Sequence, residues 1–398
     1  MKEITIEIYD LEMKLVGVLP GFTSLTWTSA FREPGTFELY TIYTDEIKDF
    51  LNVNYFLSRS DSNLVGQIKK IELSRDQDGK RIAHLTGRDS LGLLDQRIIY
   101  HTITYTGDIV GFIKQIINDN AISPSSSVRQ IPLFESISGS NIGINVRAQV
   151  RWNNVMEKVK ELCVQAGVGI RSVRGTTGFV LEIYPQLNRT ADQSANTQLI
   201  FSDGLENLAA WNYSQDYELY RNFAYIAGEA TGKALSNSSV VIGERLIMGD
   251  AAYMIGNRVT ETIGNNLKGI NRYELYVDAR NLQSETEDGT TISSSEYRDM
   301  LQQAGFEALE DTQIAYTFDA ESVNGIVYNY PEDFALGDVA TIDTGTVKAE
   351  AVISAVTEIF DSTGYSVFPT FELLAIRFVL ATEALDDIIA ENGNEIIT

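Results

Sequence analysis

The sequence predicts an α+β protein that is mostly β, with two small barrel-like strand domains, an α/β insertion between them and a C-terminal helix. The chain has 19 Tyr and 17 Phe against 7 Pro, and this composition suits strands. Stretches that alternate between apolar and polar residues gather before residue 100 and after residue 196. At 398 residues the chain exceeds one ordinary core, so we expect more than one domain.

Strand patterns fill residues 1–100, which we assign to an N-terminal barrel-like domain. The start, MKEITIEIYD, alternates apolar and charged residues and predicts a first strand, not an export signal. The stretch SLTWTSAFREPGTFELYTIY contains two alternating runs joined at Glu33–Gly35. A hairpin follows in LVGQIKKIELSRDQDGKRIAHLTGRD, with its turn at Gln77–Gly79.

Residues 101–195 mix helices and strands and form the predicted α/β insertion. In TGDIVGFIKQIINDN, Thr106 is the expected N-cap, and five large apolar residues share one helical face. WNNVMEKVKELCVQAG predicts a second amphipathic helix that stops at Gly167. Cys163 lies on the apolar face of this helix, so we expect a buried packing thiol and not a nucleophile.

Residues 196–372 return to strands and form the second barrel-like domain. One helix is expected inside it, in SSSEYRDMLQQAGFEALED, where Ser293 and Glu296 are spaced as a capping box. Further on, NYPEDFALGDVATIDTG predicts a turn and then a strand that starts near Gly337 and Asp338. Residues 373–398 are predicted to form an acidic, amphipathic C-terminal helix.

The residue types that ordinary catalytic and metal sites need are scarce. The chain holds one Cys and two His, and neither His84 nor His101 has a second His or a Cys at metal-ligand spacing. No serine nucleophile elbow, dinucleotide-binding loop or complete phosphate loop is present. We therefore predict no catalytic, cofactor-binding or metal-binding residues and no enzymatic activity.

The net charge of the chain excludes some classes of function but does not identify one. The formal net charge of −24 repels phosphate, which argues against nucleic-acid binding through the bulk surface. The same charge fits plain solubility or a surface that lets a polyanion pass. No apolar run approaches the ~20 residues of a membrane helix, so we expect no membrane insertion.

Two functional alternatives stay open at this point. A pair of carboxylates in a cleft is the requirement of a cell-wall polysaccharide or peptidoglycan hydrolase, and 55 acidic residues supply many candidates. A host-surface adhesin would bind sugars through exposed aromatics such as Trp27, Trp152 or Trp211. For Trp152, at the start of a predicted helix, packing in the core is the favoured interpretation.

Several segments together resemble the tail-associated baseplate hub proteins of long-tailed phages of Gram-positive hosts. These segments are GRDSLGLLDQRII (Gly87 to Ile99), NRYELYVDARN (Asn271 to Asn281), and FALGDVATID followed by GYSVFPTFEL. Their order and spacing match as well, and the resemblance spans roughly residues 1–372.

The resemblance implies a structural role, similar to that of the hubs of contractile tails. It implies a homotrimer whose two barrel domains per chain imitate a six-fold ring, closing the tail tube and adapting it to a three-fold tip. Its partners would be the distal tail protein and tail tube, the tape measure protein, and receptor-binding or fibre proteins. The protein would belong to the virion tail tip, assembled in the host cytoplasm, with an acidic channel through which DNA passes without specific binding.

The resemblance also marks four structural positions. Gly337 and Asp338 are implied to let a turn between barrel strands pass close to a neighbour. Arg88 and Arg97 are implied to pair with internal acidic groups, and two exposed cations are an equal alternative. Many family members carry a C-terminal peptidase, lyase or fibre-like stalk, whereas about 26 residues follow the hub region here. This departure argues against an enzymatic role and leaves open which protein supplies the tip.

Overall fold

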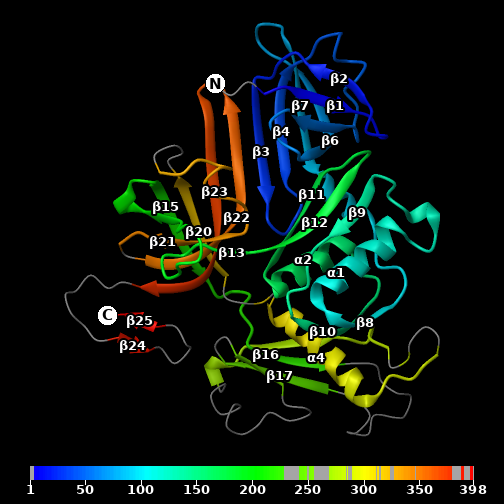
Figure 1. Cartoon of the computed structure of the whole chain (residues 1–398), viewed down its shortest axis with the longest axis vertical. Coiled ribbons are helices and arrows are strands. Elements are labelled where there is room, and N and C mark those ends of the chain that lie inside the picture. The colour runs from blue at the N-terminus through cyan, green and yellow to red at the C-terminus, as the bar shows by residue number, and fades with distance from the viewer. Residues whose placement is uncertain are drawn as a thin grey trace.

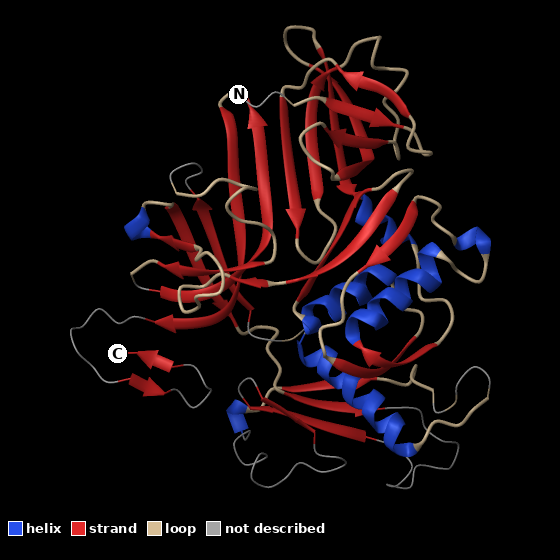
Figure 2. Ribbon diagram, in the orientation of Figure 1, coloured by secondary structure: helices blue, strands red, loops and turns tan. Residues whose placement is uncertain are grey.

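The computed structural model describes residues 4–227, 242–248, 251–254, 269–283, 285, 289–310, 312, 315–322, 327–345, 347–378, 387–389 and 395–397. Strands make up most of its regular structure, and the long helices gather on one side of the molecule (Figures 1 and 2). The predicted fold class, α+β and mostly β, is confirmed.

The first block of strands follows the alternation seen in the sequence. On β3 and β4, every second side chain is buried, because one face of the sheet packs on a core while the other stays accessible. The predicted turns at 33–35 and 77–79 join β3 to β4 and β6 to β7 as antiparallel hairpins. The strands of this block are β1 (Ile6–Tyr9), β2 (Leu15–Leu19), β3 (Ser24–Ala30), β4 (Thr36–Ile42), β5 (Phe56–Arg59), β6 (Val65–Arg75) and β7 (Arg81–Asp89).

The second block of strands lies at the other end of the described chain. Its centre is a hairpin of two 15-residue strands, β22 and β23, which turns at residues 361–364. The strands of this block are β13 (Leu187–Asn188), β14 (Ile200–Ser202), β15 (Leu208–Asp216), β20 (Ala315–Ser322), β21 (Asp338–Asp343), β22 (Val347–Asp361) and β23 (Gly364–Phe378), with the short helix η4 (Asp203–Leu205).

Both blocks belong to one 14-stranded sheet. The hydrogen-bonded order is β15-β20-β23-β22-β3-β4-β7-β6-β5-β1-β2, with β13 and β14 attached through β21. The blocks meet where residues 25–30 of β3 pair antiparallel with residues 355–360 of β22. Among the described strands, β15 does not pair with β2 or β6, so the sheet is open, and β15 lies far from β6 in Figure 1.

The insertion packs helices α1 and α2 against short strands around the largest hydrophobic core. Asp108, not the expected Thr106, caps α1, because its Oδ1 accepts from the Val110 N–H. Gly167 ends α2 in the left-handed region, as predicted. Its elements are η1 (Ser90–Gln96), β8 (Ile103–Asp108), α1 (Ile109–Ile117), η2 (Asn118–Ile122), η3 (Ser127–Arg129), β9 (Phe134–Ser138), β10 (Asn145–Val150), α2 (Val155–Ala166), β11 (Val168–Arg174) and β12 (Phe179–Pro185).

A second segment between β15 and β20 joins the insertion in space (Figure 1). Helix α4 begins with the predicted capping box, in which the Ser293 and Glu296 side chains bond 2.8 Å apart. Asp299 of α4 accepts from Arg147 of β10 at 2.8 Å, which ties the helix to the insertion. The described elements are β16 (Phe223–Ala227), β17 (Ile242–Met248), β18 (Ala251–Met254), η5 (Gly269–Asn271), β19 (Glu274–Asp278) and α4 (Ser294–Glu310).

The predicted C-terminal helix over 373–398 is wrong for the part of it that the structure describes. Strand β23 continues to Phe378, because residues 373–378 extend the antiparallel ladder with β22. Two short strands follow, β24 (Asp387–Ile389) and β25 (Glu395–Ile397), which pair with each other. The rest of this predicted helix lies outside the described residues.

No helix in the described ranges combines the length and apolar character needed to cross a bilayer.

Candidate functional site: the centre of the long sheet

The centre of the sheet is the place where the two strand blocks become one structure. Backbone bonds between β3 and β22 cross from one block to the other, and the Thr28 and Thr357 hydroxyls lie 2.9 Å apart on the accessible face. On the buried face of the same strands lie Trp27 and Phe360. The junction therefore combines a hydrogen-bonded ladder with a buried apolar layer.

A buried ion cluster reinforces this junction. Arg59 of β5 forms a bidentate pair with Glu358 of β22, with N–O distances of 2.7 and 2.9 Å. Its remaining hydrogen bonds go to both carboxylate oxygens of Asp61, at 2.9 and 2.8 Å. Arg59 and Glu358 side chains are 3% and 8% exposed, so the pair is well shielded from water. The cluster ties β5, which does not pair with β22, to the second block.

Aromatic rings complete the surroundings of this cluster. The Arg59 guanidinium lies 4.8 Å from the Phe360 ring centre and 5.7 Å from that of Trp27. Tyr365 of β23 donates to Glu358 Oε1 at 2.9 Å. Burial, together with the adjacent Glu358 carboxylate, raises the pKa of Tyr365. Burial alone would lower the pKa of Arg59, but the hydrogen bonds to its two carboxylates raise it. Both groups therefore keep their protons and their hydrogen bonds at neutral pH.

Two of the four marked positions, Gly337 and Asp338, lie beside this junction. Gly337 has φ +86°, and a Cβ added there would lie 2.4 Å from Cε2 of Phe31, which follows β3. The buried Asp338 accepts from Arg189 at 2.8 Å and from the Ala335 N–H at 3.0 Å. The turn thus passes close to a neighbouring segment of the same chain.

The other two marked positions, Arg88 and Arg97, lie near the two ends of η1. Arg88 pairs with Asp95, and both side chains are partly exposed. Arg97 donates instead to the backbone carbonyls of Arg129, at 2.6 Å, and Gln96, at 3.1 Å. No acidic side chain among the described residues forms an ion pair with Arg97. The structure does not bring these arginines together with Gly337 and Asp338.

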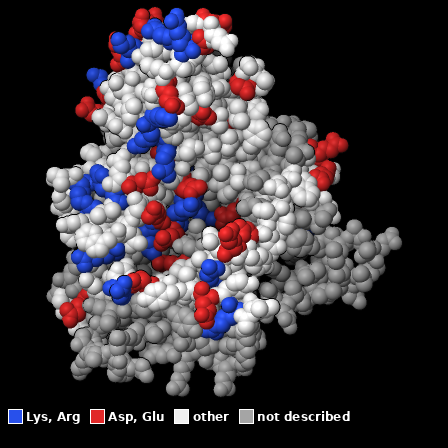
Figure 3. Space-filling view, turned by 180° about the vertical axis from the view of Figure 1, so that it is seen from behind, with Lys and Arg blue, Asp and Glu red and all other residues white. Residues whose placement is uncertain are grey.

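The accessible face of the sheet is polar. It carries Thr26 and Thr28 of β3, Glu38 and Tyr40 of β4, and His84 of β7. The Tyr40 and His84 rings stack 4.2 Å apart, and the His84 nitrogens lie 2.7 Å from a Glu38 oxygen and 3.2 Å from a Glu72 oxygen. His84 thus has the strand-packing role that the sequence favours. Seen from behind, Lys and Arg lie among Asp and Glu in a band down the molecule (Figure 3).

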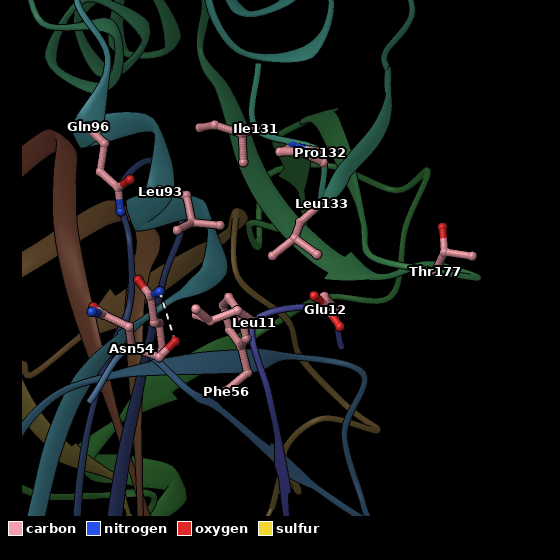
Figure 4. Close-up of a pocket in the computed structure, with 11 residues that line it drawn as sticks. Leu11, Glu12, Asn54, Phe56, Leu93, Gln96, Ile131, Pro132, Leu133 and Thr177 are labelled. Carbon is pink, nitrogen blue, oxygen red and sulfur yellow. Dashed lines mark hydrogen bonds between the residues drawn. The ribbon is translucent and has the colours of Figure 1, made fainter. Parts of the chain in front are cut away.

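One open cleft of about 590 Å³ lies between the first block and the insertion (Figure 4). Apolar side chains dominate it, and Glu12 is the one ionisable residue in its lining. A glycosidase needs two carboxylates that face each other across the bond to be cut, and this cleft offers one. The residues that line it are Leu11, Glu12, Asn54, Phe56, Gln67, Leu93, Gln96, Ile131, Pro132, Leu133 and Thr177.

The residues considered for chemistry lie apart from one another. Cys163 is buried in the insertion core, and burial raises the pKa of its thiol to about 12. No group of three or more His, Cys, Asp or Glu side chains within the described ranges is arranged to hold a metal ion.

The three tryptophans differ in their exposure. Trp27 is buried and stacks on Phe37, which removes it as a sugar-binding candidate. Trp211 is 39% exposed and stacks on Phe318, at 5.8 Å between ring centres. Trp152 is 50% exposed, so the core position favoured by the sequence is wrong. Its backbone has φ +63°, which turns the ring outward from the start of α2.

Sequence reasoning missed the buried cluster. Arg59 and Glu358 are 299 residues apart, and Arg59 ends β5, a four-residue strand that is buried throughout and does not alternate. One usable signal was present: a Glu between Thr357 and Ile359 occupies a position that alternation assigns to the buried face, where a carboxylate needs a partner.

The comparisons with known proteins agree with this geometry. A family model described as Siphovirus ReqiPepy6 Gp37-like protein matches residues 5–371. The sequence matches none of the curated proteins to which it was compared.

Solved structures of tail proteins share the fold. The 43 kDa tail protein of prophage MuSo2 from Shewanella oneidensis is 13% identical, with a TM-score of 0.52, and the match covers 93% of this chain and 98% of that protein. The prophage tail protein gp18 from Listeria monocytogenes EGD-e is 12% identical, with a TM-score of 0.51 and coverage of 92% and 94%. The resemblance to phage tail proteins is confirmed, and the chain belongs to the Siphovirus ReqiPepy6 Gp37-like protein family.

Proposed function

We propose that this chain is a non-enzymatic structural hub of a phage tail tip, in which copies join edge to edge into a trimeric ring that closes the tail tube. The ring adapts the six-fold tube to a three-fold tip, because each chain contributes two similar strand blocks. Family membership and the tail proteins that share the fold support a place in the virion tail.

The observation that carries the proposal is the long sheet with open edges. Among the described strands, β15 pairs with β20, and β5 pairs with residues 65–67 of β6. Residues 70–75 of β6 therefore pair with β7 alone among the described strands. Unpaired strand edges expose backbone N–H and C=O groups and are templates for pairing with another chain.

The two edges also differ in charge. This free half of β6, residues 70–75, carries Lys70 and Arg75 against one acidic residue, Glu72. Lys and Arg side chains lie beside Asp and Glu at the end of the molecule that holds the β6–β7 turn (Figure 3). Strand β15 ends at Asp216 and has Glu206 on its other flank. Complementary edges favour head-to-tail contact between different copies, and such contacts form rings when the rotation closes.

The accessible face of the sheet suits the wall of a bore. Its Thr side chains are small, and its cations Lys70 and Arg88 are each paired with a carboxylate, Glu72 and Asp95. A wall of this kind gives DNA no row of cations to bind, so DNA passes without specific contacts. In this arrangement the distal tail protein and tube contact one rim, the tape measure protein enters the bore, and receptor-binding or fibre proteins surround the tip.

Native mass spectrometry and light scattering over a range of concentrations test the oligomeric state. A trimer, seen as a ring with a central opening by electron microscopy, is the expected result. A chain that stays monomeric at every concentration, alone and with the distal tail protein, contradicts the proposal. Zymography on host cell walls tests the hydrolase alternative, and cleared zones that depend on this chain would favour that alternative.

A further inference from the structure

A cluster of exposed aromatic and half-buried basic side chains lies on the insertion. This patch consists of Arg97, Tyr100, Arg129, Arg151 and Trp152. The Tyr100 and Trp152 rings meet edge to face at 5.5 Å and are 46% and 50% exposed. The Arg129 guanidinium lies 5.1 Å from the Tyr100 ring centre, and that of Arg151 lies 4.8 Å from the Trp152 ring centre.

Hydrogen bonds to the backbone fix the segments that carry the patch. The Ile99 N–H donates to Asn153 O at 2.9 Å, and the Trp152 N–H donates to Ile99 O at 2.8 Å. Arg129 donates to Ile98 O at 2.5 Å, which fixes the loop that carries it. Because these segments are locked before any ligand arrives, binding costs little conformational entropy.

Backbone strain marks Trp152 as more than a chance exposed residue. Its φ of +63° is rare and energetically unfavourable for a bulky side chain. That conformation keeps half of a large ring in water, where burial would be favourable. Strain that exposes an aromatic ring is a sign of a binding role.

The charge of the patch is opposite to that of the chain. None of Arg97, Arg129 and Arg151 forms an ion pair with an acidic side chain in the part of the chain that the structure describes. This occurs in a protein of net charge −24, where 55 acidic residues are available. Arg97 Nε lies 2.6 Å from the Arg129 backbone O, and burial together with the neighbouring Arg129 charge lowers the pKa of Arg97. An incoming carboxylate would relieve this repulsion.

We propose that this patch is a docking site for an acidic segment of another protein, in which carboxylates flank an apolar side chain. Trp, Tyr and Arg are the residues that dominate binding energy at protein interfaces. The exposed Ile98 and Val128 beside the patch supply aliphatic contact area that a sugar or a phosphate chain does not need. The two rings stand at 84° to each other, so they do not form the parallel platform on which successive bases stack.

A labelled synthetic peptide in which Asp and Glu flank Leu and Phe provides the probe. Fluorescence anisotropy measures its affinity for the full chain, and a peptide with Asn and Gln in place of the acids is the ligand control. We expect the acidic peptide to bind, and the charge-reversal variant R129E/R151E to bind it at least tenfold more weakly. The matched variant R75E/K80E makes the same charge change on the β6–β7 hairpin and should bind as the natural chain does.

Because Arg151 is partly buried, its substitution could disturb folding, so a second variant leaves Arg151 in place. Val128 is 88% exposed, so V128E adds a carboxylate at the rim without disturbing the core. It should also weaken the acidic peptide at least tenfold, with an unchanged melting temperature. Equal weakening by R75E/K80E, no binding of the acidic peptide, or tighter binding of a single-stranded oligonucleotide or a sulfated glucan would overturn the proposal. Loss of self-association in R129E/R151E would overturn it too, because the patch would then be a contact between copies.

Discussion

The centre and the edges of the long sheet differ in how their strands are paired. At the centre, β3 and β22 pair through backbone bonds, and the buried Arg59–Glu358 pair lies beneath them. At the edges, the described strands that pair with β15 and with the free half of β6 are β20 and β7, each on one side. This difference fits the proposed function, in which the chain joins its own two blocks at the centre of the sheet and other copies bind at its edges.

The largest expected effect is at the centre, in Glu358→Ala. This change leaves the Arg59 charge buried with Asp61 as its remaining carboxylate, and breaking a buried pair costs about 3–5 kcal/mol. Urea unfolding followed by circular dichroism measures the free energy of unfolding. The control is Glu72→Ala, which removes exposed contacts with Lys70 and His84 and should lower the free energy of unfolding far less. Equal effects of the two changes would mean that the buried cluster does not hold the blocks together.

A smaller loss is expected for Gly337→Ala. An alanine there adopts an unfavourable positive φ and also presses on Phe31, so we expect a loss of about 2–3 kcal/mol. Gly345→Ala is the matched control, because Gly345 has φ +75° and nothing within 4 Å of an added Cβ. Its loss should be about 1 kcal/mol, from the backbone alone. If Gly345→Ala lowers the free energy of unfolding as much as Gly337→Ala does, the contact with Phe31 does not contribute to the loss at Gly337.

The smallest stability effect is expected at Arg88→Ala. The partner of Arg88 is the partly exposed Asp95, and such pairs contribute about 0–1 kcal/mol. Thermal unfolding measures the change. A loss of several kcal/mol would place Arg88 in a structural role comparable to that of Arg59.

Cys163 gives a chemical test of the packed core of the insertion. Burial raises the pKa of its thiol to about 12, and the thiolate is the reactive form. The native chain should therefore resist iodoacetamide at pH 8, while the urea-unfolded chain reacts fully, as mass spectrometry would show. Fast labelling of the native chain would mean that the core opens easily.

Local features of the fold were predictable from the sequence. The turns at 33–35 and 77–79 and the end of α2 at Gly167 depend on neighbouring residues, whose preferences act over a few positions. The same local patterns failed at residues 373–378. There the alternating pattern was interpreted as one apolar face of a helix. In the structure these residues pair with β22 and form a strand.

Long-range features of the candidate site were not predictable. The pairing of β3 with β22 joins segments about 330 residues apart, and many alternating strands could have paired equally well. The marked Gly337 and Asp338 were found through a resemblance, but their contacts with Phe31 and Arg189 come from distant parts of the chain. The sequence predicted Trp152 in the core because its neighbours are apolar. In the structure Trp152 has a positive φ, and its side chain is 50% exposed.

Cross-linking of the edges tests the central claim most directly. Ser74 lies in the free half of β6 and Ser214 lies in β15, and Cys163 is buried and does not interfere. With a short bismaleimide, the S74C/S214C chain should give covalent trimers, each single variant should stay uncross-linked, and a mixture of the two single variants should give dimers. Trimers in solution without cross-links between these positions, or cross-links from Leu15→Cys on β2 instead of Ser74→Cys, would contradict head-to-tail pairing of β6 with β15.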